Sequence, residues 1–311
     1  MQTTIPPDRL ERIRALGYAY ADQPNERLRT CNLCGGSVLV AVTHRDRYGY
    51  PARATACSRC GLVFLNPRMT PHAYGRFYDG IYRPLVSAFH GRLIDATTIQ
   101  AEQRAYAADR AAMVRPFIES AGLRTMLDIG GSTGVVAGHF AREFGLTGTL
   151  VDPAPLEVAE AKALGLETIT GLVEDYDFGG RRFDLVLICQ TIDHLLDVSG
   201  TLARVRELLT DRGRLFVDIV DFRAAYLRNW SVEDATKIDH PYYLTQNTME
   251  AFLRRAGFSI LAVDYAADHL HVSYLCQPSA PHPDALPDPG AVRDLFRELR
   301  FVQNAARDPR N

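Results

Sequence analysis

The sequence lacks any marked excess of one charge, since its 35 lysines and arginines stand against 37 aspartates and glutamates over 311 residues. A protein that binds nucleic acid through bulk charge carries a basic stripe or patch, so this balance argues against that class. The chain also lacks any apolar run that approaches the ~20 residues of a membrane span. We therefore expect neither a membrane protein nor a protein with a broadly basic surface.

A secretion signal is lacking too, because residues 1–17 contain no apolar core. This absence predicts a cytoplasmic protein, in which thiols stay reduced and a disulfide framework is not expected. Six cysteines are nevertheless present. Cys189 and Cys276 lie in apolar runs and are interpreted as core residues, which leaves four cysteines to explain.

The remaining cysteines form two C-x2-C pairs, Cys31 with Cys34 and Cys57 with Cys60, and 22 residues separate the pairs. Two such pairs can supply four thiolates to one tetrahedral metal ion, whereas a redox motif of thioredoxin type needs only one pair in a βαβ context. The pattern predicts an N-terminal zinc-ribbon domain over residues 1–75. A zinc ion with four protein ligands has no position open to a substrate, so we expect a structural role.

Arginines gather in and beside the same segment. They are Arg45, Arg47, Arg53, Arg59 and Arg68. This set is consistent with a solvated basic face. It is also consistent with a site for an anionic group, such as the phosphate of a phosphate-bearing substrate.

Short apolar segments alternate with helical ones from residue 125 onward. The predicted strands cover 125–129, 148–151, 167–170, 183–189, 214–220, 259–265 and 270–277, and the helices between them cover 135–144, 155–164, 198–209 and 248–256. Strands that alternate with helices predict a parallel sheet covered on both faces. We therefore predict an α/β fold over residues 125–277, with a doubly wound, seven-stranded, mostly parallel sheet that ends in an antiparallel pair.

Two further segments flank this predicted sheet. Residues 76–124 are rich in helix-forming residues and are predicted to be a helical connector or lid, with Pro116 interrupting or kinking its end. Residues 278–311 start with five prolines between 278 and 290. They are predicted to form an extended linker followed by a short amphipathic helix at 291–304.

The loop after the first predicted strand lies in the string LDIGGSTG, residues 127–134, and opens a helix as a nucleotide-binding loop does. The dinucleotide fingerprint G-x-G-x-x-G does not fit, because Ser132 and Val135 occupy its later glycine positions. Asp128 precedes the first glycine by two places; it would disfavour a pyrophosphate and suits a cationic amine. S-adenosylmethionine has such an amine beside its sulfonium. Asp152 ends the second strand, where a carboxylate can accept both ribose hydroxyls.

Four strings together carry a family resemblance: LDIGGSTG, LVDPAP, RRFDLVLICQTIDHLLD and GRLFVDIVD. On these the chain resembles the class I S-adenosylmethionine-dependent methyltransferases. The double C-x2-C pattern, CSRCGLVFLNPRMT and RFYDGIYRP narrow the resemblance to methyltransferases with an N-terminal zinc-binding domain. That group includes C-methyltransferases of deoxysugar nucleotides and relatives in polysaccharide and natural-product clusters.

The resemblance implies a Rossmann-like methyltransferase fold and a set of cofactor-binding residues. The set is Asp128, Gly130, Gly131, Ser132, Gly134, Asp152, Pro153, Glu174 and Gln190. Ser132 replaces the usual middle glycine of the loop, and Leu172 follows Gly171 where the family has an acidic residue for the adenine amine. Either Glu174 or Asp175 takes that role, or the adenine is held by backbone and packing.

Methyl transfer to a hydroxyl or carbon acceptor requires alignment and removal of a proton, which indicates a general base. His194 follows the fourth strand, at the carboxyl edge where doubly wound folds bind ligands; it either acts there or only caps the loop. His240 lies in residues 221–244, which we interpret as a lid. Asp239 with His240 resembles the acidic–histidine pair of the sugar C-methyltransferases and could form an oriented base, or it lies on the surface.

Tyr78 and Tyr82 match an aromatic pair that follows the zinc domain in the family. Four residues apart on a helix, they share one face, so they either pack or contact the acceptor or cofactor. His269 and His271 alternate on the last predicted strand, and we expect a structural role for them.

These features lead to one functional hypothesis, with catalytic candidates His240, His194, Asp239 and Tyr78. The chain is predicted to transfer a methyl group from S-adenosylmethionine to a small polar acceptor: a sugar, a sugar nucleotide or a natural-product intermediate. One alternative is an RNA methyltransferase that uses the ribbon arginines. Another is a scaffold protein that binds S-adenosylmethionine without catalysis.

Overall fold

A computed structural model describes residues 7–307, and its largest element is a seven-stranded sheet. The strands are β6 (Thr125–Ile129), β7 (Thr147–Asp152), β8 (Glu167–Thr170), β9 (Phe183–Ile188), β10 (Leu209–Val220), β12 (Phe258–Tyr265) and β13 (His271–Pro278). Their order is β12-β13-β10-β9-β6-β7-β8, and β13 is antiparallel to both of its neighbours. The prediction of a seven-stranded, mostly parallel, doubly wound sheet is confirmed.

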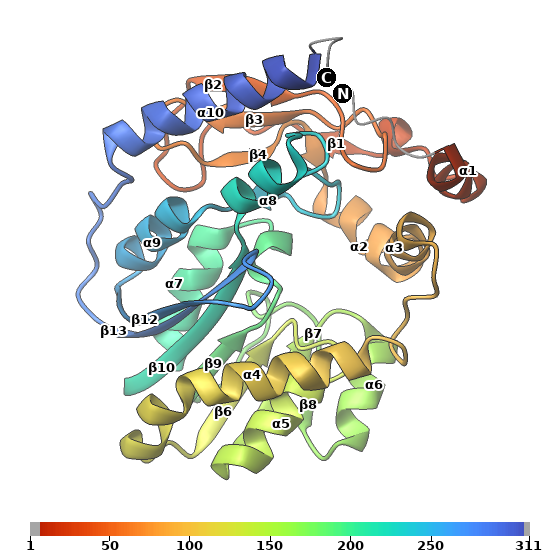
Figure 1. The fold of residues 1–311 in the computed structure, drawn as a ribbon. Helices are drawn as coiled ribbons and strands as arrows, with labels where there is room; N and C mark the ends of the chain where they lie inside the picture. The colour runs from red at the N-terminus through yellow and green to blue at the C-terminus, as the bar shows by residue number, and fades with distance from the viewer. Residues whose placement is uncertain (1–6, 308–311) are drawn as a thin grey trace.

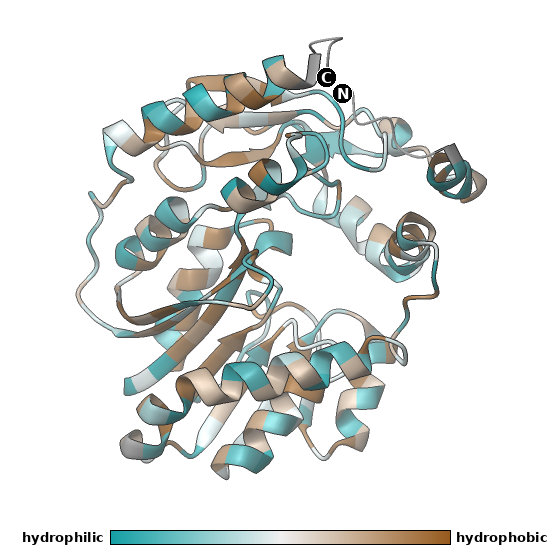
Figure 2. Cartoon of the chain, viewed as in Figure 1, coloured by the Kyte–Doolittle hydropathy of each residue, from teal (hydrophilic) through white to brown (hydrophobic). Residues whose placement is uncertain are grey.

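Helices cover both faces of this sheet (Figure 1). They are α4 (Gln100–Ile118), α5 (Val135–Phe144), α6 (Pro155–Ala163), α7 (Val198–Leu208) and α9 (Gln246–Arg255). Alternate residues of β9 point to opposite faces: Leu185 packs with α4, α5 and α6, while Val186 packs with α7 and α9. In Figure 2 the strands are largely hydrophobic and α4 alternates in hydropathy, as expected for a buried sheet and a one-sided helix.

The N-terminal part forms a second, antiparallel sheet in the order β11-β4-β3-β2. Its strands are β2 (Leu39–Thr43), β3 (Ala54–Cys57), β4 (Val63–Leu65) and β11 (Tyr242–Tyr243), while β1 (Asn25–Glu26) pairs with β5 (Arg68–Met69). Strand β11 lies far along the chain from the other three, and Tyr242 pairs with Phe64. A segment that follows the large sheet therefore completes the small one.

The remaining helices surround the small sheet. They are α1 (Pro7–Ala15), α2 (Pro71–Gly80), α3 (Tyr82–His90), α8 (Phe222–Asn229) and α10 (Pro289–Arg307). Short 3-10 turns occur elsewhere in the chain as η1 (Tyr20–Asp22), η2 (Glu119–Ala121) and η3 (Ile192–His194). Helix α10 lies across the strands β2 to β4 (Figure 1), where Leu299 and Val302 join the core of the small sheet.

The connector differs in detail from its predicted form. An irregular segment at 91–99 divides it into α3 and α4, and α4 continues two residues past Pro116 to Ile118. Pro116 therefore lies inside the last turn and does not end the helix. Within residues 7–307, no helix is both long enough and apolar enough to cross a membrane.

Candidate active site

The glycine-rich loop runs from the end of β6 to the start of α5. Gly130 and Gly134 have φ of 69° and 74°, in the left-handed region that favours glycine. A Cβ on Gly131 would lie 2.5 Å from the Oδ2 atom of Asp128 and from Leu150. Ser132 replaces a glycine of the family pattern and still adopts a positive φ of 51°. The loop thus keeps its backbone close to the Asp128 carboxylate.

Asp128 is completely buried, and neither oxygen of its carboxylate has a hydrogen-bond partner in the described structure. Burial raises its pKa to about 7, with further contributions from the charges of Asp152 and Asp218. A buried carboxylate without a donor is costly, so the site favours a cationic donor from a ligand. The ammonium group of S-adenosylmethionine fits this requirement.

Asp152 closes the other side of the loop. Its Oδ2 atom accepts a hydrogen bond from the N–H of Ser132 at 2.9 Å, and its Oδ1 atom accepts one from the N–H of Ala154 at 2.8 Å. Burial raises the pKa of this carboxyl. Each oxygen keeps a lone pair for a further donor, as a ribose hydroxyl would provide.

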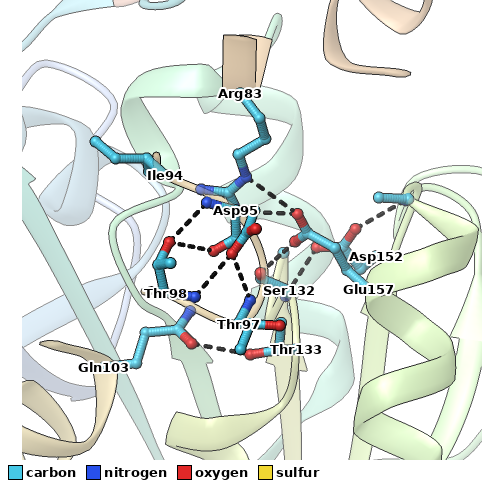
Figure 3. A network of polar contacts seen from close by, with 12 residues as sticks. Arg83, Ile94, Asp95, Thr97, Thr98, Gln103, Ser132, Thr133, Asp152 and Glu157 are labelled. Carbon is cyan, nitrogen blue, oxygen red and sulfur yellow. Dashed lines mark hydrogen bonds and ion pairs between the residues drawn. The ribbon is translucent and has the colours of Figure 1, made fainter. Parts of the chain in front are cut away.

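The connector is tied directly to this loop (Figure 3). The Ser132 hydroxyl donates to Glu157 of α6, and Arg83 of α3 donates to the same carboxylate at 2.8 Å. The Thr133 hydroxyl and Gln103 of α4 lie 2.8 Å apart. The sequence did not predict a role for Arg83, Gln103 or Glu157. Only Glu157 had a sequence signal, because it lies in the helix that directly follows Asp152.

The remaining predicted cofactor residues lie around the loop in different ways. Gln190 has a positive φ and its N–H donates to Asp218, and Thr191 next to it donates to the Gly130 carbonyl. Pro153 is exposed after Asp152. Glu174 is exposed as well, and its carboxylate accepts from Thr201 of α7.

A second cluster brings together the predicted catalytic residues from three parts of the chain. His194 comes from η3, Tyr78 from α2, and Asp239 and His240 from the segment after α8. The Tyr78 hydroxyl lies 2.8 Å from His194 Nδ1 and 2.8 Å from the Asp239 carbonyl oxygen. The rings of His194 and His240 meet edge-on, with centroids 4.4 Å apart. Tyr82 also packs against His194.

These contacts assign the protons of His194. A carbonyl can only accept, so the single proton of the Tyr78 hydroxyl goes to Asp239. The Tyr78 oxygen then accepts from His194 Nδ1–H, which leaves the lone pair of Nε2 free. Burial lowers the pKa of His194 to about 4, so the ring is neutral near pH 7. A neutral imidazole with a free Nε2 is the form that can accept a proton.

His240 is held differently from His194. It is buried, and its Nδ1 and Nε2 atoms lie 3.8 Å from carboxylate oxygens of Asp193 and Asp239. This distance exceeds that of a hydrogen bond. Burial lowers its pKa well below the usual value. His240 therefore packs as a neutral ring against His194.

Two cations border this cluster. Lys237 Nζ lies 3.6 Å from Asp239 Oδ2, and burial lowers the lysine pKa to about 8. Burial by itself would raise the pKa of Asp239, but the charges of Lys237 and Arg47 lower it overall. Asp239 is thus a carboxylate between basic groups. Arg47 comes from the loop between β2 and β3.

A cavity of about 900 Å³ lies away from the glycine loop. Residues of α1, of β2 and the loop after it, and of 231–234 line it, including Tyr48 and Tyr50. The glycine loop, His194 and His240 are not among its lining residues. The chemistry of the buried carboxylate and histidines, not cavity size, therefore locates the candidate site.

The four paired cysteines form a separate cluster whose sulfur atoms lie within 4.8 Å of one another. The sulfurs of Cys31 and Cys60 are 3.5 Å apart, as are those of Cys34 and Cys57. These distances are too long for disulfides. In a tetrahedral zinc site with Zn–S bonds of about 2.3 Å, neighbouring sulfur atoms lie about 3.8 Å apart, and the distances here are close to that value. The cluster fits a tetrahedral metal ion.

The two other histidines considered from the sequence lie at the start of the last strand. His271 is the first residue of β13, and its Nδ1 atom lies 2.6 Å from an oxygen of Asp268. His269 has a positive φ of 54° in the turn that joins β12 to β13, so the prediction that both alternate on the strand is wrong for His269.

Comparison with known proteins adds independent information. A family model described as a methyltransferase domain matches residues 99–263. A ubiquinone biosynthesis O-methyltransferase of Azorhizobium caulinodans is 29% identical over 155 residues, which cover 45% of this chain and 60% of that protein. A protein of the same name from Rhodopseudomonas palustris is 34% identical over 115 residues, or 35% of this chain and 42% of that protein. The chain thus spans about half the length of these curated relatives.

Among solved structures, an S-adenosylmethionine-dependent methyltransferase from Clostridium acetobutylicum is 14% identical, with a TM-score of 0.46. The match covers 67% of this chain and 99% of that chain.

Proposed function

The chain belongs to the methyltransferase-domain family, and from this premise we propose that it transfers a methyl group from S-adenosylmethionine to a small polar acceptor. The family match confirms the predicted class I methyltransferase domain. The observation that carries the proposal is the buried carboxylate of Asp128, which has no donor of its own beside a glycine-rich loop. The name of the curated relatives supports a hydroxyl group as the acceptor.

The residues around the loop have separate tasks toward the cofactor. Asp128 accepts hydrogen bonds from the ammonium group, and the backbone of Gly130 to Gly134 lies against the ligand. Asp152 accepts the ribose hydroxyls through its remaining lone pairs. Pro153, Glu174 and Gln190 are proposed to border the adenosine. S-adenosylmethionine supplies an electrophilic methyl group on its sulfonium.

His194 is proposed as the general base. Its Nε2 lone pair would take the proton of the acceptor hydroxyl while the acceptor oxygen forms its bond to the methyl carbon and the bond between that carbon and sulfur breaks, with S-adenosylhomocysteine as the leaving group. Tyr78 holds the ring in the Nδ1–H tautomer through the hydrogen bond described above. The neutral ring of His240 packs against His194, and the Asp239 carboxylate places a negative charge on the same side of the site. Both residues are proposed to position His194 and the acceptor.

The four cysteines are proposed to hold a structural zinc ion. With all four positions filled by thiolates, the metal has no place for a substrate. Asn32, inside the first cysteine pair, donates to Asp197 at 2.7 Å, three residues beyond His194. The metal site is therefore connected to the segment that carries the proposed base.

The acceptor class is a proposal on chemical grounds. A sugar, a sugar nucleotide or a natural-product intermediate offers hydroxyl groups of the required kind. The half-buried ring cluster of Tyr78, Tyr82 and His194 provides edges and faces that suit such a molecule.

Calorimetric titration with S-adenosylhomocysteine tests the proposal. Binding in the micromolar range is expected for the wild-type chain, and His194→Ala is expected to bind equally well because this residue acts on the acceptor. Absence of binding at high micromolar concentrations to the folded wild-type protein would overturn the proposed function.

A further inference from the structure

The carboxylate of Glu157, in α6, joins the helical connector to the glycine-rich loop (Figure 3). Its Oε1 atom accepts from Arg83 of α3, at 2.8 Å from Nη2 and 3.3 Å from Nε, and its Oε2 atom accepts from the Ser132 hydroxyl. Each oxygen thus serves one side of the bridge. The side chains of Arg83 and Glu157 are only 27% and 18% exposed, so water and salt screen this ion pair less than a surface pair.

Arg83 lies between the proposed acceptor groups and the cofactor loop. Its central carbon is 5.4 Å from the ring centroid of Tyr82, and Tyr82 packs against His194. Among residues 7–307, Glu157 supplies the only carboxylate within 4.0 Å of its guanidinium. Backbone N–H groups keep the pKa of Asp95 low, and Arg83 adds to this only as a more distant charge. The contact with Glu157 is therefore the ion pair that fixes Arg83.

Ser132 has a backbone conformation that is unfavourable for a residue with a side chain. Its φ of 51° lies in the left-handed region, where glycine is the usual residue. Its N–H donates to Asp152 Oδ2 at 2.9 Å, and its hydroxyl donates to Glu157. Non-glycine residues held in this region by surrounding contacts are frequent at functional sites. The hydroxyl gives this position a contact that glycine cannot make.

The bridge ends at Asp152, the carboxylate proposed to accept the ribose hydroxyls. Because Asp152 Oδ2 accepts from the Ser132 N–H, a shift of that peptide would change the hydrogen bond that orients the carboxylate. Burial raises the pKa of Asp152, its two backbone hydrogen bonds lower it, and the nearby charges of Glu157 and Arg83 act in opposite directions. Arg83 thus offsets the negative charge that Glu157 brings to this side of the site.

We propose that Arg83, Glu157 and Ser132 are positioning residues for the ribose of the cofactor. Arg83 holds the Glu157 carboxylate, Glu157 holds the Ser132 hydroxyl, and the N–H of Ser132 orients Asp152. This inference rests on the proposed function and deepens it, because it gives the connector a part in recognising the cofactor. All three residues act through Asp152, so the proposal requires no contact between them and the methyl group.

Calorimetric titration of the full chain with S-adenosylhomocysteine and with its analogue that lacks both ribose hydroxyls tests the proposal. The wild type is expected to bind S-adenosylhomocysteine at least about tenfold more tightly, because the analogue leaves a buried acceptor unpaired. Arg83→Gln and Ser132→Gly are each expected to reduce this preference to about threefold or less, with affinity for the analogue within about twofold of the wild-type value. A purely structural role would weaken the binding of both ligands alike.

A double variant distinguishes a relay from two independent effects. Arg83 and Ser132 both act through Glu157, so Arg83→Gln combined with Ser132→Gly is expected to bind S-adenosylhomocysteine about as weakly as the weaker single variant. Arg83→Lys keeps the charge without the planar fork and is expected to retain part of the preference. Glu157→Gln removes the charge that joins the two residues and is expected to reduce the preference as well, which provides the test if another variant does not fold.

Arg92→Gln is the matched control. Arg92 also belongs to the connector and pairs with Glu102 at 2.8 Å, but within residues 7–307 no hydrogen bond or ion pair joins either residue to the glycine-rich loop. This variant is expected to leave both affinities unchanged.

Four results for the variants overturn the inference: equal weakening for the two ligands, an unchanged preference, additive losses in the double variant, or the same loss in Arg92→Gln. A wild type that binds both ligands equally well also overturns it, while the proposed function stands. A folded wild type that binds neither ligand removes both the inference and the proposed function.

Discussion

At the residue scale, two polar groups are the most informative. One has oxygen atoms without a hydrogen-bond partner, and the other has a single proton whose acceptor can be assigned. Asp128 has two orphaned oxygens, and Tyr78 has one proton for two neighbours. Buried polar groups are normally paired, so each of these arrangements indicates either a ligand or a fixed proton position. Two predictions follow from them directly.

Asp128→Asn is expected to stabilise the ligand-free protein and to weaken cofactor binding. Burial raises the pKa of Asp128 to about 7, so the stability that the carboxyl contributes is present below its usual value of 3.8 and is lost as pH rises through 7. At pH 8 the substitution removes an unpaired buried charge. We expect Tm to rise by about 1–2 °C, as for about 1 kcal/mol in a chain of 311 residues.

Differential scanning fluorimetry and calorimetry check this pair of effects. The difference in Tm is expected to disappear at pH 4, where the native carboxyl is protonated. Binding of S-adenosylhomocysteine is expected to weaken at least about tenfold at pH 8, because the substitution removes a charge-assisted hydrogen bond. A variant that is less stable at pH 8 and still binds the ligand would show that Asp128 serves the fold instead.

Tyr78→Phe is expected to release the tautomer of His194. The phenyl ring cannot accept from Nδ1–H, and the Asp239 carbonyl loses its donor, which costs about 1–3 kcal/mol of stability. Nitrogen NMR of the histidine rings is the measurement: the wild type is expected to show His194 as the Nδ1–H form and the variant a mixture. Tyr82→Phe is the control, since Tyr82 meets the same ring only by its edge. An unchanged tautomer in Tyr78→Phe would contradict the proton assignment.

At the element scale, the small sheet and helix α10 show how distant segments complete each other. Strand β11 pairs with β4, and α10 covers β2 to β4 with Leu295, Leu299 and Val302 (Figure 1). Helix α10 is amphipathic, as its alternating hydropathy in Figure 2 shows. Its apolar stripe is buried against the ribbon, so the helix stabilises that part of the fold.

Leu299→Ala is expected to lower the free energy of unfolding by about 2–5 kcal/mol, because Leu299 is 3% exposed and the substitution leaves a cavity. Phe301→Ala removes a larger side chain from the same helix, but Phe301 is 63% exposed, so a change within about 1 kcal/mol is expected. Urea unfolding of both variants measures the contrast. Similar losses for the two would mean that α10 does not dock as described.

At the scale of the whole molecule, the cysteine cluster belongs to the same core as the large sheet. Cys31, Cys57 and Cys60 lie in one hydrophobic cluster with residues of β6, β9 and β10. The hydrogen bond from Asn32 to Asp197 joins the first cysteine pair to the segment after His194. The ribbon is therefore built into the main fold, and its loss should affect the whole chain.

Removal of the metal tests this integration. The purified chain is expected to contain about one zinc per molecule, and chelation or Cys57→Ser is expected to lower Tm by at least about 3 °C, as for at least about 2 kcal/mol in a chain of 311 residues. Unfolding should remain a single transition, followed by both fluorescence and circular dichroism. Two separate transitions, with the ribbon melting alone, would contradict a shared core.

Much of the fold could be predicted from local sequence pattern. The nearly continuous apolar run of β9 and the strand–helix order predicted the large sheet, because a strand of a parallel sheet is buried on both faces. The end of the connector was predicted less well: α4 continues to Ile118, although Pro116 inside its last turn removes one backbone hydrogen bond.

The sequence by itself determined the chemistry of this protein: the cysteine pairs, the glycine loop with Asp128 before it, and the histidines near strand ends. Spacing along the chain is enough for these, because the groups that act together are close in sequence or stand at a common sheet edge. Only the tertiary structure decided that Arg83 reaches Glu157, that Tyr78 fixes the tautomer of His194, and that the N–H of Arg47 donates to the Thr236 carbonyl. Those contacts join segments up to 189 residues apart (236 − 47), and no local pattern records which distant groups a compact fold brings together.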